Sequence, residues 1–91
     1  MAYSDLKLKH EGVLKEFLFW KAKYAARDKF DRFTVYGYYN KPKKLLGQWN
    51  GNLACMISAC DTSFLKWEDK EPINIEKALK IIERMKGEKN D

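Results

Sequence analysis

The strongest constraint on the fold is a run of β-branched and aromatic residues at positions 32–39. The run reads Arg-Phe-Thr-Val-Tyr-Gly-Tyr-Tyr, and such side chains favour extended backbone in a sheet. Residues 40–44 have turn composition, and Pro42 lacks the N–H that a continuing sheet ladder needs. We therefore predict a strand over 32–39, a turn, and a returning antiparallel strand over residues 45–49.

The next segment is predicted to extend this sheet. Asn50-Gly51 is the preferred pair for a tight type I′ hairpin turn, which favours a third strand after it. Residues 53–60 are ambiguous, because their large side chains also recur at helical spacing and Asn52 is a suitable helix cap. We predict a strand there and keep a helix as the alternative. Residues 64–67 are predicted to form a short edge strand.

Two amphipathic helices are predicted on either side of these strands. From Ser4 to about residue 29, apolar residues fall on one broad stripe at 100° per residue, which predicts a long N-terminal helix. A second helix is predicted to begin at Asn74 as its N-cap and to stop at Gly87, with residues 88–91 as a frayed tail.

The order helix, antiparallel meander, helix predicts an α+β fold. Ninety-one residues suit a single domain, so we expect one domain over residues 1–91, with three or four strands and the C-terminal helix packed on one sheet face. No apolar run approaches the roughly 20 residues of a membrane span, and the first residues lack the apolar core of a signal peptide. We therefore expect a cytoplasmic protein without membrane contact.

The sequence offers little for catalysis or metal binding. His10 is the only histidine and lies on the apolar stripe, which favours a partly buried structural role over a proton shuttle. Cys55 and Cys60 are spaced for neither a local disulfide nor a zinc site, so buried reduced thiols are expected. There is no phosphate-binding glycine loop and no supported nucleophile, so we predict a non-enzymatic protein with no metal and no cofactor.

A cluster of carboxylates is the feature that would support an enzyme instead. Glu68, Asp69 and Glu71 lie in a charged loop beside Trp67, and paired carboxylates can divide acid and base roles. Such a loop is normally only hydrated. The enzyme alternative therefore requires these side chains to line a deep pocket in the folded chain.

The positive charge of the chain predicts a binding surface. The formal net charge is +5, and the excess of lysine and arginine belongs to residues 1–49, although lysine-rich surfaces are also common for solubility. In a strand over 32–39, Tyr36 and Tyr38 share one face, where rings can stack on bases while nearby cations contact phosphates. We predict a site for single-stranded nucleic acid, formed by Arg32, Tyr36, Tyr38, Lys41, Lys43 and Lys44.

Two further details bear on that site. Gly37, between the two tyrosines, would let a flat ligand approach the strand closely. The alternative is that the tyrosines cover the core and expose only their hydroxyls.

A second surface is predicted on the long N-terminal helix, opposite its core stripe. Four residues follow one another there at helical spacing: Phe19, Ala22, Ala26 and Phe30. The small alanines would let another helix approach, and such an exposed ridge marks a homodimer contact or a docking site for an acidic protein surface. The alternative is that the chain's own sheet or C-terminal helix covers the ridge. A protein-interaction factor, such as an inhibitor or adaptor, is thus the second predicted function.

Overall fold

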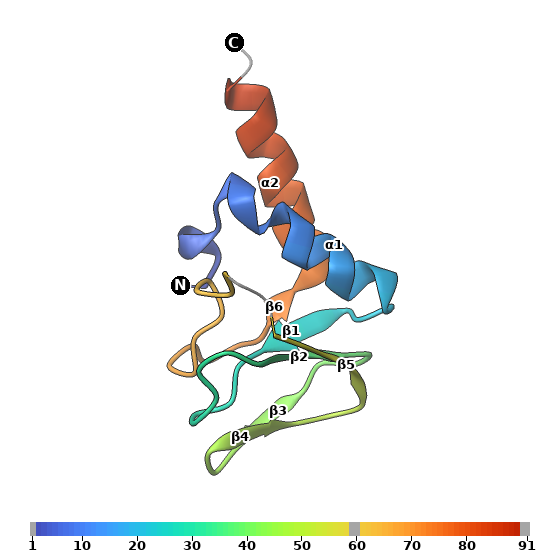
Figure 1. Cartoon of the computed structure of the whole chain (residues 1–91), viewed down its shortest axis with the longest axis vertical. Coiled ribbons are helices and arrows are strands. Elements are labelled where there is room, and N and C mark those ends of the chain that lie inside the picture. The colour runs from blue at the N-terminus through green and yellow to red at the C-terminus, as the bar shows by residue number, and fades with distance from the viewer. Residues whose placement is uncertain (1, 59–60, 90–91) are drawn as a thin grey trace.

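The computed structural model describes residues 2–58 and 61–89 and has the predicted α+β architecture, with a helix near each end and antiparallel sheets between them. Two short 3-10 turns, η1 (Ala2–Asp5) and η2 (Leu8–His10), lead into helix α1 (Glu11–Phe19). Helix α2 (Ile75–Lys89) follows the last strand. Both helices lie on one side of a four-stranded sheet, and a two-stranded hairpin lies on the other side (Figure 1).

The four-stranded sheet has the order β5-β2-β1-β6, and every neighbouring pair is antiparallel. Its strands are β1 (Tyr24–Ala26), β2 (Val35–Tyr38), β5 (Leu53–Ile57) and β6 (Ile73–Asn74). The separate hairpin pairs β3 (Lys43–Leu45) with β4 (Gln48–Asn50). No helix among residues 2–58 and 61–89 is both long enough and apolar enough to cross a membrane.

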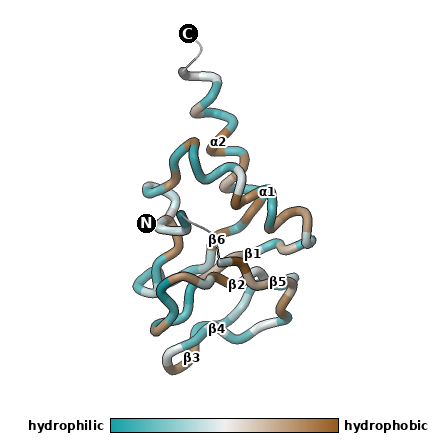
Figure 2. The backbone as a smooth tube through the Cα atoms, viewed as in Figure 1, coloured by the Kyte–Doolittle hydropathy of each residue, from teal (hydrophilic) through white to brown (hydrophobic). Residues whose placement is uncertain are grey.

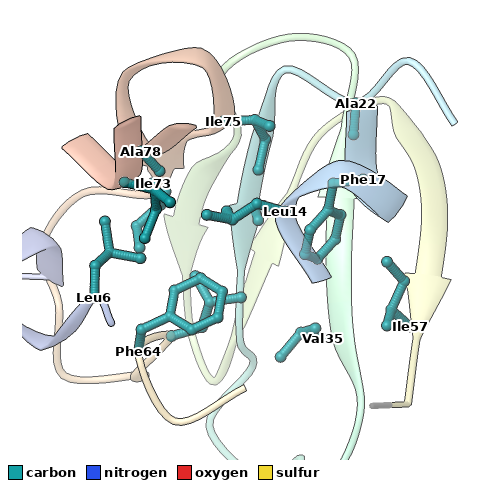
Figure 3. Packing of buried hydrophobic residues seen from close by; sticks show 13 residues of the cluster. Leu6, Leu14, Phe17, Ala22, Val35, Ile57, Phe64, Ile73, Ile75 and Ala78 are labelled. Atoms are coloured by element: carbon teal, nitrogen blue, oxygen red, sulfur yellow. The ribbon is translucent and has the colours of Figure 1, made fainter. Parts of the chain in front are cut away.

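The main core lies between the helices and the sheet. Phe17 of α1 is fully buried there, between its helix and strands β2 and β5 (Figure 3). The helix can approach because β2 carries Gly37: a Cβ at this position would lie 2.8 Å from Phe17, Ala22 and Cys55. Gly37 therefore makes room for the chain's own helix and not for a flat ligand.

The N-terminal helix ends at Phe19, ten residues before the predicted end. Lys21 adopts a φ of 66°, and the N–H groups of Lys21 and Ala22 donate to the carbonyls of Leu18 and Phe17 at 2.9 and 3.0 Å. This pattern is a Schellman motif, which usually has glycine at the left-handed position. The prediction of a helix to residue 29 is wrong because Lys21 terminates it without that sequence signal.

Residues 24–26 form the strand β1 inside the sheet instead of continuing a helix. Ala25 pairs with Gly37 of β2 on one side and with Ile73 of β6 on the other. Two ladders of hydrogen bonds thus hold a segment whose alanines favour a helix in isolation. Tertiary pairing overrides the local preference here.

Other predicted boundaries are partly corrected. The strand predicted from residue 53 is confirmed as β5, whereas residues 64–67 form turns and not an edge strand. The chain leaves the sheet over residues 39–42, inside the predicted turn at 40–44, but Lys43 and Lys44 already belong to β3. The hairpin turn lies at Leu46 and Gly47, where Gly47 has a φ of 77°, so the strand predicted over 45–49 is wrong. The Asn50-Gly51 hairpin is wrong too, because β4 and β5 belong to different sheets. Asn74 caps α2 as predicted, since its Oδ1 accepts the N–H of Lys77 at 3.1 Å. The helix then continues through Gly87 to Lys89, so the predicted stop and the start of the tail are wrong.

Candidate functional site

The predicted aromatic face of β2 is covered by the hairpin. Only 4% of Tyr38 is exposed, because Trp49 of β4 packs with it and with Ala26, and Tyr36 is half-buried beside them. Burial raises the pKa of the Tyr38 phenol, and a hydrogen bond with Asp31 raises the pKa of Tyr36. The prediction of an open stacking pair is therefore wrong, and the alternative, in which the tyrosines cover the core, fits the structure.

Two of the predicted cations are committed to contacts within the chain. Lys44 donates to the backbone carbonyls of Trp67 and Asp69, and its ammonium lies 4.1 Å from the centre of the Trp67 ring. Lys41 forms a 2.7 Å ion pair with Glu71, and this hydrogen-bonded contact raises the pKa of Lys41. Both lysines tie the loop before β6 to the rest of the fold.

The other two predicted cations, Arg32 and Lys43, are exposed. Neither side chain has a partner in the part of the chain that the structure describes. The loop that carries Arg32 is joined to the hairpin, because the Lys29 N–H donates to the Gly47 carbonyl at 3.2 Å. Lys43 is the first residue of β3 in this hairpin, so the loop and the hairpin belong to the same end of the molecule (Figure 1).

Exposed apolar side chains occur in this loop and at the turn of the hairpin. Phe30 is 82% exposed and Phe33 is 75% exposed, while Leu46 at the hairpin turn is fully exposed. Phe30 extends beside Gly47, and the Lys29 ammonium lies 5.4 Å from the centre of the Phe30 ring. We call this set the hairpin-end surface; it comprises Lys29, Phe30, Arg32, Phe33, Lys43, Leu45 and Leu46.

Arg27 holds the loop that presents the hairpin-end surface. Its guanidinium donates to the carbonyls of Asp31 and Arg32 within the loop, at 3.2 and 2.7 Å. On its other side it donates to the Leu65 carbonyl at 2.7 Å and to the carbonyl and hydroxyl of Thr62. Burial lowers the pKa of Arg27 from its usual high value. No local signal in the sequence marks Arg27, because the predicted helix to residue 29 includes it, whereas in the structure it follows β1 in a loop.

The apolar ridge predicted on the N-terminal helix does not form. Ala22 and Ala26 are buried, so neither can contact a partner. Phe19 ends α1 and packs edge-on against Trp20 with ring centres 5.2 Å apart, whereas Phe30 belongs to the hairpin-end surface. The ridge is absent because it required one helix through all four residues, and that helix ends at the first of them.

The predicted carboxylates line a cavity of about 590 Å³. Its lining residues are Tyr3, Tyr24, Lys41, Glu68, Asp69, Lys70, Glu71, Pro72 and Lys77. A pocket lined by these carboxylates, as the enzyme alternative requires, is thus present, and Glu71 forms an ion pair with Lys41 in it at 2.7 Å. Across residues 2–58 and 61–89, no group of three histidine, cysteine or acidic side chains is arranged to hold a metal ion.

His10 is fully buried and packs on Phe64, with ring centres 4.6 Å apart. Its Nδ1 accepts the Lys7 N–H at 3.0 Å, so the proton of a neutral ring resides on Nε2, which lies 3.2 Å from Asp61 Oδ1. These contacts are those of a structural histidine, as predicted, and it is more deeply buried than expected.

Cys55 is partly buried, and burial raises the pKa of its thiol. It is free and reduced in the structure, whereas Cys60 lies outside the described residues.

Comparison with known protein families, with curated proteins and with solved structures finds no match to this chain. The hairpin-end surface and the cavity are the two places whose geometry bears on function.

Proposed function

We propose that the protein is a non-enzymatic binding protein that contacts single-stranded nucleic acid through the hairpin-end surface. The observation that carries the proposal is the exposure of at least three quarters of Phe30 and of Phe33 in the loop that also carries Arg32. A base stacked on an aromatic side chain contributes about 1–3 kcal/mol, and neighbouring cations contact the phosphates. This loop replaces the tyrosine face of β2 as the stacking platform.

The charges around the two rings support the same proposal. Lys29, Arg32 and Lys43 make no ion pair with any described carboxylate. The two acidic residues of the loop are turned to contacts within the chain: Asp28 accepts the Trp49 N–H at 2.8 Å, and Asp31 bonds with Tyr36. Three cations are thus available to a phosphate backbone.

The first test is the salt dependence of binding. Fluorescence anisotropy with labelled single-stranded RNA and DNA should detect binding in dilute buffer. If three phosphates are neutralised, the affinity should fall about 20-fold between about 50 and 200 mM salt, since the slope for single strands is about −0.7 per contact. Binding that is absent in dilute buffer, or that does not change with salt, would refute the proposal.

The second test removes the rings. The double variant Phe30→Ala/Phe33→Ala should weaken binding about 30-fold or more, which is the loss of about 1 kcal/mol at each ring. Phe19→Ala is the matched control, because Phe19 is equally exposed but belongs to the end of α1. The control should bind like the wild type. Equal effects of the two changes would show that the rings of the hairpin end have no special role.

A protein-interaction factor is the second candidate, favoured by an exposed apolar cluster at the end of α1. Leu18, Phe19 and Trp20 each leave about half or more of their surface exposed, and the end of α1 is hydrophobic in Figure 2. Contiguous apolar exposure of this kind is typical of protein contacts. A second copy of the chain or a larger acidic protein would cover it. Competition with a short polyanion of any sequence separates the two proposals. If the polyanion displaces a bound partner, the result favours nucleic-acid binding over a protein-interaction factor.

A further inference from the structure

The cavity of about 590 Å³ has the form of a small-molecule site. It lies between η1, β1, the loop before β6 and the first turn of α2. Pro72 is buried and Tyr3 and Tyr24 are half-buried, so these three rings form its inner wall, whereas most of its charged residues are exposed at the rim. Ligand pockets of about 300–1,000 Å³ commonly combine an apolar wall with a few polar groups that orient the ligand.

The wall of the cavity is held by contacts from separate parts of the chain. The Tyr3 hydroxyl accepts the Asn74 N–H at 2.9 Å, which ties η1 to the start of α2. The Lys77 ammonium lies 4.6 Å from the centre of the Tyr3 ring. On the opposite side, Lys44 donates to the Asp69 carbonyl at 2.9 Å. The site is therefore formed before a ligand arrives.

The charges at the rim are balanced and only partly paired with one another. Lys41 and Glu71 neutralise each other at 2.7 Å. Lys70 and Lys77, and likewise Glu68 and Asp69, have no ion-pair partner in the described parts of the chain. A phosphate-rich ligand would meet the unpaired carboxylates, and a cationic ligand would meet the unpaired lysines. A ligand that carries both charges satisfies the whole rim.

We propose that this cavity binds a small aromatic zwitterion, of which a free aromatic amino acid is the simplest. The ring packs against Tyr3, Tyr24 and Pro72. The ligand carboxylate accepts hydrogen bonds from Lys77, near the positive end of the α2 dipole, and the ligand ammonium donates to Glu68 or Asp69. This site is separate from the hairpin-end surface, so the proposal stands whether or not nucleic acid binds there.

The test is a titration of the ¹⁵N-labelled protein followed by NMR, with four probes that differ in one group each. L-Phenylalanine should give saturable shifts of the backbone amides of residues 68–77 at millimolar concentration. 3-Phenylpropionate lacks the ammonium and phenethylamine lacks the carboxylate, and each should bind at least about fivefold more weakly, the loss of about 1 kcal/mol for one exposed ion pair. L-Alanine, which lacks the ring, should give no saturable shift.

A matched pair of variants completes the test. Lys77→Gln should weaken the binding of L-phenylalanine about fivefold. Lys80→Gln, on the next turn of α2 and outside the cavity, should leave it unchanged. 3-Phenylpropionate that binds as tightly as L-phenylalanine, shifts that do not saturate, or equal effects of the two variants would each overturn the proposal. Affinity for RNA is measured separately, at residues 29–46, and neither result decides the other.

Discussion

Arg27 is expected to contribute more to stability than any other charged side chain at the hairpin end. Its guanidinium makes five hydrogen bonds, to the carbonyls of Leu65, Asp31, Arg32 and Thr62 and to the Thr62 hydroxyl. The change Arg27→Met keeps most of the apolar stem and removes all five donors. Only the hydrogen bonds are then in question, because methionine fills similar space.

The size of the stability loss in Arg27→Met depends on which of the former acceptors water can reach in the variant. Arg32 is exposed and Asp31 is partly exposed, so their carbonyls regain water at little cost. Leu65 and Thr62 are buried, with 2% and 5% of their surface exposed. The Thr62 carbonyl still accepts the Leu65 N–H at 3.0 Å, so two buried acceptors lose their partner, the Leu65 carbonyl and the Thr62 hydroxyl. At about 1 kcal/mol for each of them, Arg27→Met should lower the free energy of unfolding by about 2 kcal/mol. For a domain of this size that is a fall in Tm of about 8–16 °C.

Urea and thermal unfolding followed by circular dichroism measure this loss. Arg32→Met is the matched control, since the Arg32 side chain is exposed and has no partner in the described chain, and it should change stability by less than about 0.5 kcal/mol. Arg27→Lys should recover only part of the loss, because a single ammonium cannot donate at once to the loop carbonyls of Asp31 and Arg32 and to the acceptors of Leu65 and Thr62. A loss below about 1 kcal/mol for Arg27→Met would refute the argument that buried carbonyls depend on this guanidinium.

Four further predictions concern other parts of the chain. Lys21→Gly should stabilise the protein by about 0.5–1 kcal/mol, because Lys21 has a φ of 66°; a loss of stability would show that the Schellman turn is not strained. Gly37→Ala should cost about 1–3 kcal/mol, since its Cβ would lie 2.8 Å from three side chains, whereas Gly12→Ala, with nothing within 4 Å, should not destabilise. Hydrogen bonds from Lys9 and Ser63 lower the pKa of Asp61, so its stabilising effect is present above the unfolded pKa of about 4 and is lost as the pH falls below it. In thermal melts the advantage of the wild type over Asp61→Asn should therefore be largest at pH 6 and should shrink steadily as the pH falls from 4 to 2, and a gap independent of pH would contradict this. If α1 mediates a dimer, Phe19→Asp should convert it to a monomer in light scattering with little loss of fold; a wild type that is already monomeric at high concentration would end this possibility.

The elements that could be predicted each carry their own local signal. Strand β2 has consecutive aromatic and β-branched residues, and α2 has an N-cap at Asn74 that accepts the Lys77 N–H. Neither depends on a distant partner to be recognised. These signals sufficed for the α+β class and for the antiparallel sheet between the helices.

The prediction of a long N-terminal helix failed because the strands that pair with residues 24–26 are distant in sequence. Residues 24–26 satisfy a helical stripe as well as a strand, and alanine favours the helix. Their strand exists because β2 and β6 lie on either side of it, and the second of these begins at Ile73. Lys21 ends α1 in a left-handed conformation that usually shows itself in a sequence as glycine. No local pattern marks either event.

The prediction of a stacking site on Tyr36 and Tyr38 failed for a related reason. Alternation placed Tyr36 and Tyr38 on one face of β2, and they do pack together on the side away from the helices. The sequence carries no signal that Trp49 of the hairpin returns to cover that face. The strand was predicted to begin at residue 32, yet it begins only at Val35, which leaves Phe33 in the exposed loop.

The exposure of Phe30 and Phe33 is best understood from how firmly their loop is held. Burying a phenylalanine side chain is worth about 1.5–3 kcal/mol, so two exposed rings forgo several kcal/mol of stability. A loose loop would let them collapse onto the molecule, but Arg27 fixes the carbonyls of Asp31 and Arg32 between the rings. A loop whose backbone is ordered in this way presents apolar rings beside unpaired cations at a lower entropic cost on binding, which favours contact with a partner that supplies both flat surfaces and negative charge.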